Sequence, residues 1–332
     1  MQKGEVRVDI LLVSGFLGAG KTSFIKAMTR ATGRQFVVLE NEFGELNLDG
    51  TLLQKGAGLA GEEKPQMQIW ELTEGCICCS MNQDFSLSVV TIANTLRPDY
   101  LLVEPSGVAL PGRIIRGLKK ISYEHIGLLA PVTIVDAGHF RAARRDYPDY
   151  FSDQLAAAGW VVLSKSERMT EDEFAQLERE LALGPGVAFP HEHYGKWPKR
   201  RWLELLARRL PDTGQAPIPH PARAPARALS HMALRGVAFA SPASLIPRLD
   251  LLVSTVFGRV VRAKGFFQTA FGDWVRFDVV DGIYEISSAP AMDEGQMVII
   301  GEHLEQEGLH RLFGGEMVAG TEEVEGEPDA NW

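Results

Sequence analysis

A glycine-rich octapeptide lies between an apolar run and an amphipathic stretch near the start of the chain. Residues 15–22 read GFLGAGKT and match the pattern G-x-x-x-x-G-K-[ST], with the apolar run at 8–13 and the amphipathic stretch at 23–30. This order predicts a strand, a tight turn and a helix whose N-terminal backbone N–H groups face an anion. We therefore expect a phosphate-binding loop rather than a merely structural turn.

The residues expected to hold a nucleotide are those of the loop and the first turn of its helix, namely Gly15, Gly18, Ala19, Gly20, Lys21, Thr22 and Ser23. Lys21 is expected to reach the terminal phosphates, and the Thr22 hydroxyl is expected to ligate Mg²⁺. Glu104 ends the apolar strand expected at 100–104, which makes its carboxylate a second candidate Mg²⁺ ligand and a catalytic candidate with Lys21 and Thr22. Gly107 could offer its backbone amide near the terminal phosphate.

Short β-branched runs alternate with helical patterns as far as residue 210. The patterns predict strands at 6–13, 36–39, 68–72, 100–104, 132–135 and 160–163, and helices at 21–30, 83–96, 112–120, 170–181 and 201–209. The helix at 170–181 is expected to begin with a capping box formed by Thr170 and Glu173. Such alternation predicts an α/β fold with a doubly wound, mostly parallel sheet.

A second domain is expected after a Pro/Ala-rich linker. We assign residues 1–210 to the nucleotide-binding domain, 211–228 to the linker, 229–315 to a smaller α+β domain, and 316–332 to an acidic tail that we expect to be mobile. In the second domain, strands are expected at 231–240, 260–270 and 297–300, helices at 243–256 and 303–312, and a hairpin at 274–286.

Charge and hydropathy exclude several classes of partner. The 332 residues are 45% hydrophobic and carry a formal net charge of −9, which argues against non-specific binding of nucleic acid. No apolar run is long enough for a membrane span, and the first residues lead into a strand rather than a signal sequence, so we expect a cytoplasmic protein without a membrane partner. The cationic patches at 141–145 and 199–201 are interpreted as solvated surface.

All three cysteines of the chain, Cys76, Cys78 and Cys79, lie in one pentapeptide that begins with Gly75. Closely spaced cysteines in a reducing compartment indicate metal or redox chemistry, and thiolates favour zinc, copper(I) or similar ions. Three thiolates leave a tetrahedral zinc site incomplete, to be finished by a carboxylate, water or a ligand from a partner. Buried cysteines without a metal are the alternative interpretation.

Six segments together resemble the CobW-type GTP-binding metallochaperones. They are the loop at 15–22, ENEFGE at 40–45, GCICC at 75–79, EPSG at 104–107, VDA at 135–137 and RAKGF at 262–266. That family is similar to the GTPases that help to insert nickel into urease and hydrogenase, and its members are implicated in delivery of zinc, cobalt or iron. The resemblance implies GTP hydrolysis coupled to transfer of a transition metal, with zinc or cobalt favoured, to a client metalloprotein.

The resemblance also assigns roles to acidic residues. It makes Glu40, Glu45 and Cys78 candidate members of the metal site, places Glu42 in the same motif, and gives Glu104 a Walker-B-like role. Carboxylates beside thiolates favour zinc or cobalt(II) over copper(I). The alternative is that these glutamates only line a solvated loop.

Base recognition departs from the usual Asn/Thr-Lys-x-Asp element of GTPases. The chain has Ser-Lys-Ser-Glu at 164–167, in which Lys165 can stack over the base and the Glu167 carboxylate can accept the guanine N–H groups. Because Glu167 has one more methylene than Asp, relaxed specificity that includes ATP stays open. Glu167 could instead only help to start the following helix.

Two other functions remain open at this stage. One is a P-loop nucleotidase or phosphotransferase with relaxed base specificity, and the other is a non-catalytic module that binds a client. The sequence leaves open the metal, the client, a homodimeric state and the roles of the acidic tail and of His191 and His193, whose segment we interpret as an ordinary loop.

Overall fold

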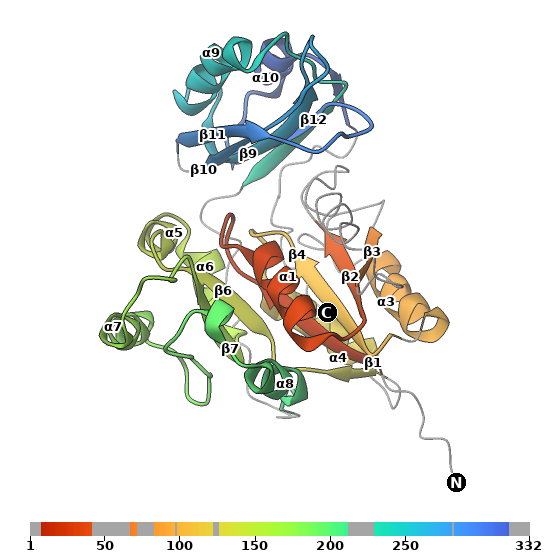
Figure 1. Cartoon of the computed structure of the whole chain (residues 1–332), viewed down its shortest axis with the longest axis vertical. Coiled ribbons are helices and arrows are strands. Elements are labelled where there is room, and N and C mark those ends of the chain that lie inside the picture. The colour runs from red at the N-terminus through yellow and green to blue at the C-terminus, as the bar shows by residue number, and fades with distance from the viewer. Residues whose placement is uncertain are drawn as a thin grey trace, which may run out of the picture. The chain divides into compact units, whose positions relative to one another are not determined.

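The computed structural model in Figure 1 describes residues 8–41, 67–71, 83–96, 98–121, 126–211, 229–280 and 282–318. The chain forms two compact units. The first is built on a parallel sheet and the second on an antiparallel one, and each has hydrophobic clusters of its own.

The first unit alternates strands and helices from residue 8 to residue 207. Its elements are β1 (Val8–Ser14), α1 (Lys21–Thr32), β2 (Phe36–Asn41), β3 (Met67–Glu71), α3 (Gln83–Thr95), β4 (Tyr100–Pro105), α4 (Pro111–Ile121), β5 (Ile126–Leu128), β6 (Val132–Asp136), α5 (Phe140–Asp146), α6 (Pro148–Ala156), β7 (Trp160–Ser164), α7 (Glu171–Leu181), the 3₁₀ helix η1 (Tyr194–Lys196) and α8 (Lys199–Ala207).

The strands of this unit pair in the order β3-β2-β4-β1-β6-β7, and β5 pairs with β1. Every pair of these strands is parallel. The expected doubly wound sheet is therefore confirmed. Because parallel strands end at one edge, the segments that follow β1, β4, β6 and β7 emerge together there.

Helices cover both faces of this sheet, as the side chains of β7 demonstrate. Trp160 and Val162 join a hydrophobic cluster with α1 and α8, whereas Val161 and Leu163 join a second cluster with α6 and α7. Alternate residues of a strand point to opposite faces, so a strand buried on both sides needs the continuous apolar run that the sequence has here. In Figure 1, α1 and α8 are seen on the near side of the strands.

Four elements of the first unit were not expected from the sequence, namely α5, α6, β5 and η1. Helices α5 and α6 are short and separated by one residue, and β5 and η1 have three residues each. Elements of that length hold too few residues to establish a period. The cationic patch at 141–145 lies on α5, where Arg141 forms an exposed ion pair with Glu180.

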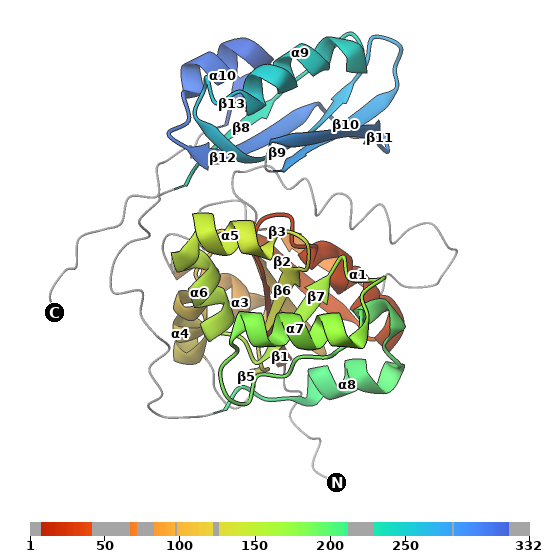
Figure 2. The ribbon, with the colours of Figure 1, turned by 90° about the vertical axis from the view of Figure 1, so that its left-hand side faces the viewer.

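The second unit is a sheet covered by helices on one face. Its elements are β8 (Ser230–Arg235), α9 (Pro242–Val253), β9 (Arg259–Gln268), β10 (Trp274–Val280), β11 (Ile283–Ser288), β12 (Gln296–Glu302), α10 (Gln306–Phe313) and β13 (Glu316–Met317). The strand order is β11-β10-β9-β12-β8-β13, with antiparallel pairing throughout. Figure 2 shows α9 and α10 on the same face of this sheet, where Leu245, Leu249 and Leu309 are fully buried.

The predicted start of the acidic tail, residue 316, is too early, because the residues there form a strand. Glu316 and Met317 form β13 on the edge of β8, and the buried Val318 donates its N–H to the carbonyl of Ala233. An edge strand offers unpaired backbone groups that a following segment can satisfy, whatever the charge of its side chains. The rest of the tail, 319–332, and the linker from 212 to 228 lie outside the described residues.

Candidate nucleotide site

The loop between β1 and α1 has a backbone that its glycines permit. Gly15, Gly18 and Gly20 all have positive φ angles, of 145°, 71° and 88°. A Cβ on Gly15 would lie only 2.3 Å from the carbonyl oxygen of Ile134 on β6, so no larger residue fits there. Gly20 directly precedes α1, whose N-terminus therefore faces the loop. This is the strand, turn and helix geometry expected of a phosphate-binding loop.

Lys21 and Thr22 begin α1 and make contacts beside the loop. Lys21 Nζ donates to the carbonyl of Gly15 at 3.2 Å, so the ammonium group lies over the loop. Thr22 Oγ1 donates to Glu104 Oε1 at 3.1 Å, and Glu104 is only 6% exposed at the end of β4. A hydroxyl and a buried carboxylate are hard oxygen donors of the kind that Mg²⁺ prefers, so this pair fits the ion.

Gly107 packs directly on the loop from the segment after β4. A Cβ at this position would lie 2.5 Å from the backbone nitrogen of Leu17. The carbonyl of Gly107 accepts a hydrogen bond of 3.0 Å from Gln154 Nε2, a buried side chain of α6. Gln154 was not expected at the site, because the sequence did not indicate α6.

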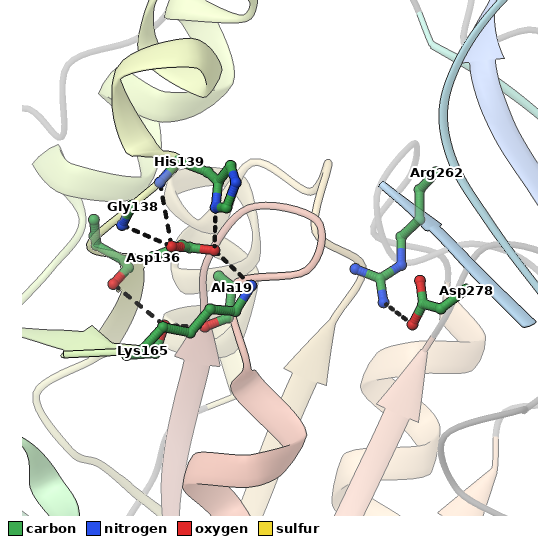
Figure 3. Close-up of polar contacts among 9 residues, drawn as sticks. Ala19, Asp136, Gly138, His139, Lys165, Arg262 and Asp278 are labelled. Atoms are coloured by element: carbon green, nitrogen blue, oxygen red, sulfur yellow. Dashed lines mark hydrogen bonds and ion pairs between the residues drawn. The ribbon is translucent and has the colours of Figure 1, made fainter. Parts of the chain in front are cut away.

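The segment after β7 is also tied to the loop. Ser164 Oγ donates to the carbonyl of Ala19 at 2.6 Å, and Lys165 has a φ of 52°. Lys165 Nζ forms an ion pair of 2.6 Å with Asp136 Oδ2 at the end of β6, as Figure 3 shows. The same carboxylate accepts the backbone N–H of Gly138 at 2.9 Å. Lys165, expected to stack over a base, is thus held by Asp136.

The environment of Asp136 keeps its carboxylate charged. Burial raises the pKa of Asp136, but the hydrogen bond and charge of Lys165 together with the N–H of Gly138 outweigh that effect, and the net pKa lies below the ordinary value. His139 lies 3.1 Å from the same carboxylate and is mostly exposed. Asp136 is therefore a positioning residue for Lys165.

Glu167 lies at the far end of this segment and faces a histidine. Its Oε1 lies 3.4 Å from Nε2 of His193, and the side chains are 64% and 10% exposed. His193 precedes η1 in a segment that the sequence suggested was an ordinary loop. No spacing pattern links residues 26 positions apart, so sequence alone could not pair them.

The expected ligands of the transition metal lie mostly outside the described residues. Cys76, Cys78, Cys79, Glu42 and Glu45 are all outside, and of Glu40 the structure describes the backbone. On the last residues of β2, Glu40 is in register with Glu104 of β4. Within the described part of the chain, no group of three or more His, Cys, Asp or Glu side chains is arranged to hold a metal ion.

Among the described residues, no helix is both long enough and apolar enough to cross a lipid bilayer.

Two family profiles match most of the chain. Residues 9–184 match the family described as CobW/HypB/UreG, nucleotide-binding domain, and residues 231–315 match the cobalamin synthesis protein cobW C-terminal domain. The two matches correspond to the parallel-sheet unit and the antiparallel-sheet unit.

Individual relatives carry related names. A zinc chaperone CobW of Pseudomonas aeruginosa is 32% identical over 204 residues, which are 54% of this chain and 54% of that protein. The zinc chaperone YeiR of Escherichia coli is 32% identical over 207 residues, 59% of this chain and 60% of that protein. The chain thus spans little more than half the length of these curated relatives. The crystal structure of Zn(II)-bound YjiA GTPase from E. coli superposes with a TM-score of 0.37 at 19% identity, covering 92% of this chain and 98% of that chain. By its family profiles, this chain belongs to the CobW/HypB/UreG family and carries a CobW C-terminal domain.

Proposed function

We propose that this chain is a cytoplasmic, GTP-dependent metallochaperone that binds a transition metal and couples GTP hydrolysis to its transfer to a client metalloprotein. The family membership and the zinc-chaperone names of the relatives support the proposal. A reducing compartment keeps closely spaced thiols free for a metal, which supports the cytoplasmic location. Zinc is the favoured cargo, and cobalt(II) suits the same mixture of thiolates and carboxylates.

The observation that carries the proposal is the register between β2 and β4. Glu40 lies opposite Glu104, whose carboxylate contacts Thr22 beside the phosphate loop. The acidic segment that begins at Glu40 therefore starts one strand away from the nucleotide site. A change in the contacts of Glu104 when the terminal phosphate leaves would displace β4 and, through their pairing, the backbone of β2 at Glu40.

The nucleotide chemistry uses the residues of the loop. Its backbone N–H groups and the N-terminus of α1 would hold the phosphates of GTP, and Lys21 would neutralise charge on the terminal phosphate. Thr22 and Glu104 would hold Mg²⁺, which would supply further neutralisation of the phosphates. The backbone N–H of Gly107 would face the terminal phosphate, and Lys165 and Glu167 would contact the base.

The cargo would be held by Cys76, Cys78 and Cys79 with carboxylates from Glu40, Glu42 and Glu45 completing the shell. Three thiolates alone leave zinc short of four ligands, and this favours handover to a client over permanent storage. Nucleotide-dependent ordering of the acidic segment would complete the shell with GTP and open it after hydrolysis.

The test is a metal titration in two nucleotide states. Affinities for Zn²⁺ and Co²⁺ are measured by competition with a chromophoric chelator, with Mg²⁺ and either a non-hydrolysable GTP analogue or GDP. Coupling between two sites is typically about 5- to 150-fold, so we expect tighter metal binding with the analogue by a factor in that range. Equal affinities in the two states would eliminate the coupled mechanism.

Two variants separate the sites in that experiment. Replacing Cys76, Cys78 and Cys79 together by Ser should abolish tight metal binding and leave GDP affinity unchanged. Lys21→Ala should weaken nucleotide binding and leave the metal affinity of the nucleotide-free protein unchanged. A triple variant that binds metal at full strength would show that the thiolates are not the ligands.

A further inference from the structure

A buried histidine faces the one acidic residue of the expected base-recognition segment. His193 is 9% exposed, and its Nε2 makes no hydrogen bond with any described residue. Among the described residues, the carboxylate oxygen nearest to it is Oε1 of Glu167, at 3.4 Å. Buried polar atoms of this kind usually have a hydrogen-bond partner, and the Glu167 carboxylate is within reach of Nε2.

The fold brings these two residues to the same edge of the sheet. Trp160 of β7 pairs in parallel with Ala188, so the chain after Ala188 emerges beside the chain after β7. Glu167 follows β7 by three residues, and His193 follows Ala188 by five. Both segments therefore reach the edge of the sheet at which the strands end and the phosphate loop lies.

The hydrogen bonds of His193 define its tautomer. The backbone N–H of Gly195 donates to Nδ1 at 3.1 Å, so Nδ1 is the acceptor nitrogen and the proton of the neutral ring is on Nε2. Burial lowers the pKa of His193, and this favours the neutral ring. The neutral ring therefore carries its one N–H on Nε2, the atom that lies 3.4 Å from the Glu167 carboxylate.

Packing restrains the His193 ring in this position. The His193 ring packs at a tilt against Tyr194, with 4.1 Å between the ring centroids, and Tyr194 packs edge-on against Phe24 of α1. A Cβ on Gly195 would lie 2.9 Å from Nδ1, so a glycine at 195 is what allows the ring to lie so close to the backbone. The helix that follows the phosphate loop thus supports His193 through Tyr194.

We propose that His193 is a positioning residue for base specificity, which holds the Glu167 carboxylate so that it can accept the N1–H and 2-amino groups of guanine. This inference rests on the proposed function. A carboxylate oxygen has two acceptor sites, so Oε1 can accept from His193 and from the base together. Glu has one more rotatable bond than the Asp usual at this position, and its side chain is 64% exposed. An N–H donor that restrains it removes part of the entropy cost of binding the base.

The test compares dissociation constants for GDP and IDP, because inosine lacks the 2-amino group that Glu167 would accept. In the full chain we expect IDP to bind about tenfold more weakly than GDP, as for loss of a hydrogen bond to a charged group. His193→Ala should reduce the ratio of the IDP dissociation constant to the GDP dissociation constant about fivefold. His193→Gln, whose amide Nε2 still donates, should keep the ratio within about twofold of the original.

Two more variants make the result independent of folding defects. Gly195→Ala keeps the histidine side chain but displaces its ring, because the added Cβ would lie 2.9 Å from Nδ1, and it should lower the ratio as His193→Ala does. The matched control is His191→Ala, since His191 lies in the same segment and pairs at 2.8 Å with a different carboxylate, that of Glu178 on α7. His191→Ala should leave the ratio unchanged.

The outcomes separate this inference from the function on which it rests. An unchanged ratio in folded His193→Ala, or in Gly195→Ala where His193→Ala does not fold, would overturn the positioning role. Equal binding of GDP and IDP by the original chain would overturn it too, while leaving a guanine-nucleotide site in place. A chain that binds neither nucleotide would overturn the proposed function itself.

Discussion

Gly107 contacts the phosphate loop at a distance that admits no side chain. The Cβ of an alanine would lie 2.5 Å from the backbone nitrogen of Leu17 and 2.7 Å from its Cα. Backbone atoms cannot move aside without displacing the loop itself. We expect Gly107→Ala to weaken GDP binding by at least about tenfold, since misplacement of a binding group by about 1 Å costs as much or more.

The matched control for Gly107 is Gly184→Ala. A Cβ at Gly184 would meet no atom within 4 Å. Isothermal titration with GDP, together with thermal unfolding of each variant, distinguishes a displaced loop from general loss of stability. If both alanine variants bind GDP as the original does, Gly107 does not shape the nucleotide site.

Individual site residues differ in how far the sequence could identify them. Lys21 and Thr22 are defined by a contiguous motif, and the apolar strand before Glu104 indicated its place at the end of β4. Contacts between segments that are distant in the sequence could not be identified in this way. The ion pair of Lys165 with Asp136 and the approach of His193 to Glu167 depend on which strands are neighbours, and a pattern within one segment does not contain that information.

The start of α7 is closed by the capping box that the sequence predicted. Thr170 Oγ1 accepts the N–H of Glu173, and the backbone N–H of Thr170 donates to Glu173 Oε2 at 2.7 Å. Removing the Thr170 hydroxyl leaves one donor of the first turn without its acceptor. We expect Thr170→Ala to lower the free energy of unfolding by about 1 kcal/mol, measured by urea denaturation.

The effect of Thr170→Ala should depend on pH. The backbone N–H and the hydroxyl of Thr170 donate to the Glu173 carboxylate and lower its pKa below the ordinary value of 4.5, and Thr170→Ala removes the hydroxyl. A lowered pKa in the folded state contributes stability that is present above 4.5 and is lost as the pH falls through the folded value. The difference between the two proteins should therefore be larger at neutral pH than well below 4.5. Ser152→Ala, at an exposed position within α6, is the control and should change stability little at either pH.

Long elements were predicted better than short ones. The strands of the first unit begin or end within about two residues of the predicted bounds, because apolar runs of five to seven residues are distinctive. The capping box located the start of α7 for the same reason, since it is a local pattern. By contrast, β5 and β13 owe their existence to the edges of β1 and β8, which only the folded sheet provides.

Each of the two units has hydrophobic clusters of its own. The core of the second unit joins buried residues of α9 and α10 with those of β8, β9, β10 and β12, and its members all lie between residues 232 and 313. The two clusters described in the first unit join residues that lie between 11 and 206. A core supplied wholly by one segment permits that segment to fold alone, and about ninety residues is an ordinary size for a domain.

We therefore expect a fragment of residues 229–318 to fold cooperatively by itself. Its urea midpoint should match that of one transition of the full chain, followed by circular dichroism. Leu249→Ala removes a side chain that is fully buried against the second sheet, and it should cost about 2 to 5 kcal/mol in the fragment and in that same transition. The other transition, and the affinity for GDP, should not change, because the described cluster that contains Leu249 consists of residues of the second unit. An unfolded fragment, or a Leu249→Ala variant that weakens GDP binding, would mean that the two units depend on each other for stability.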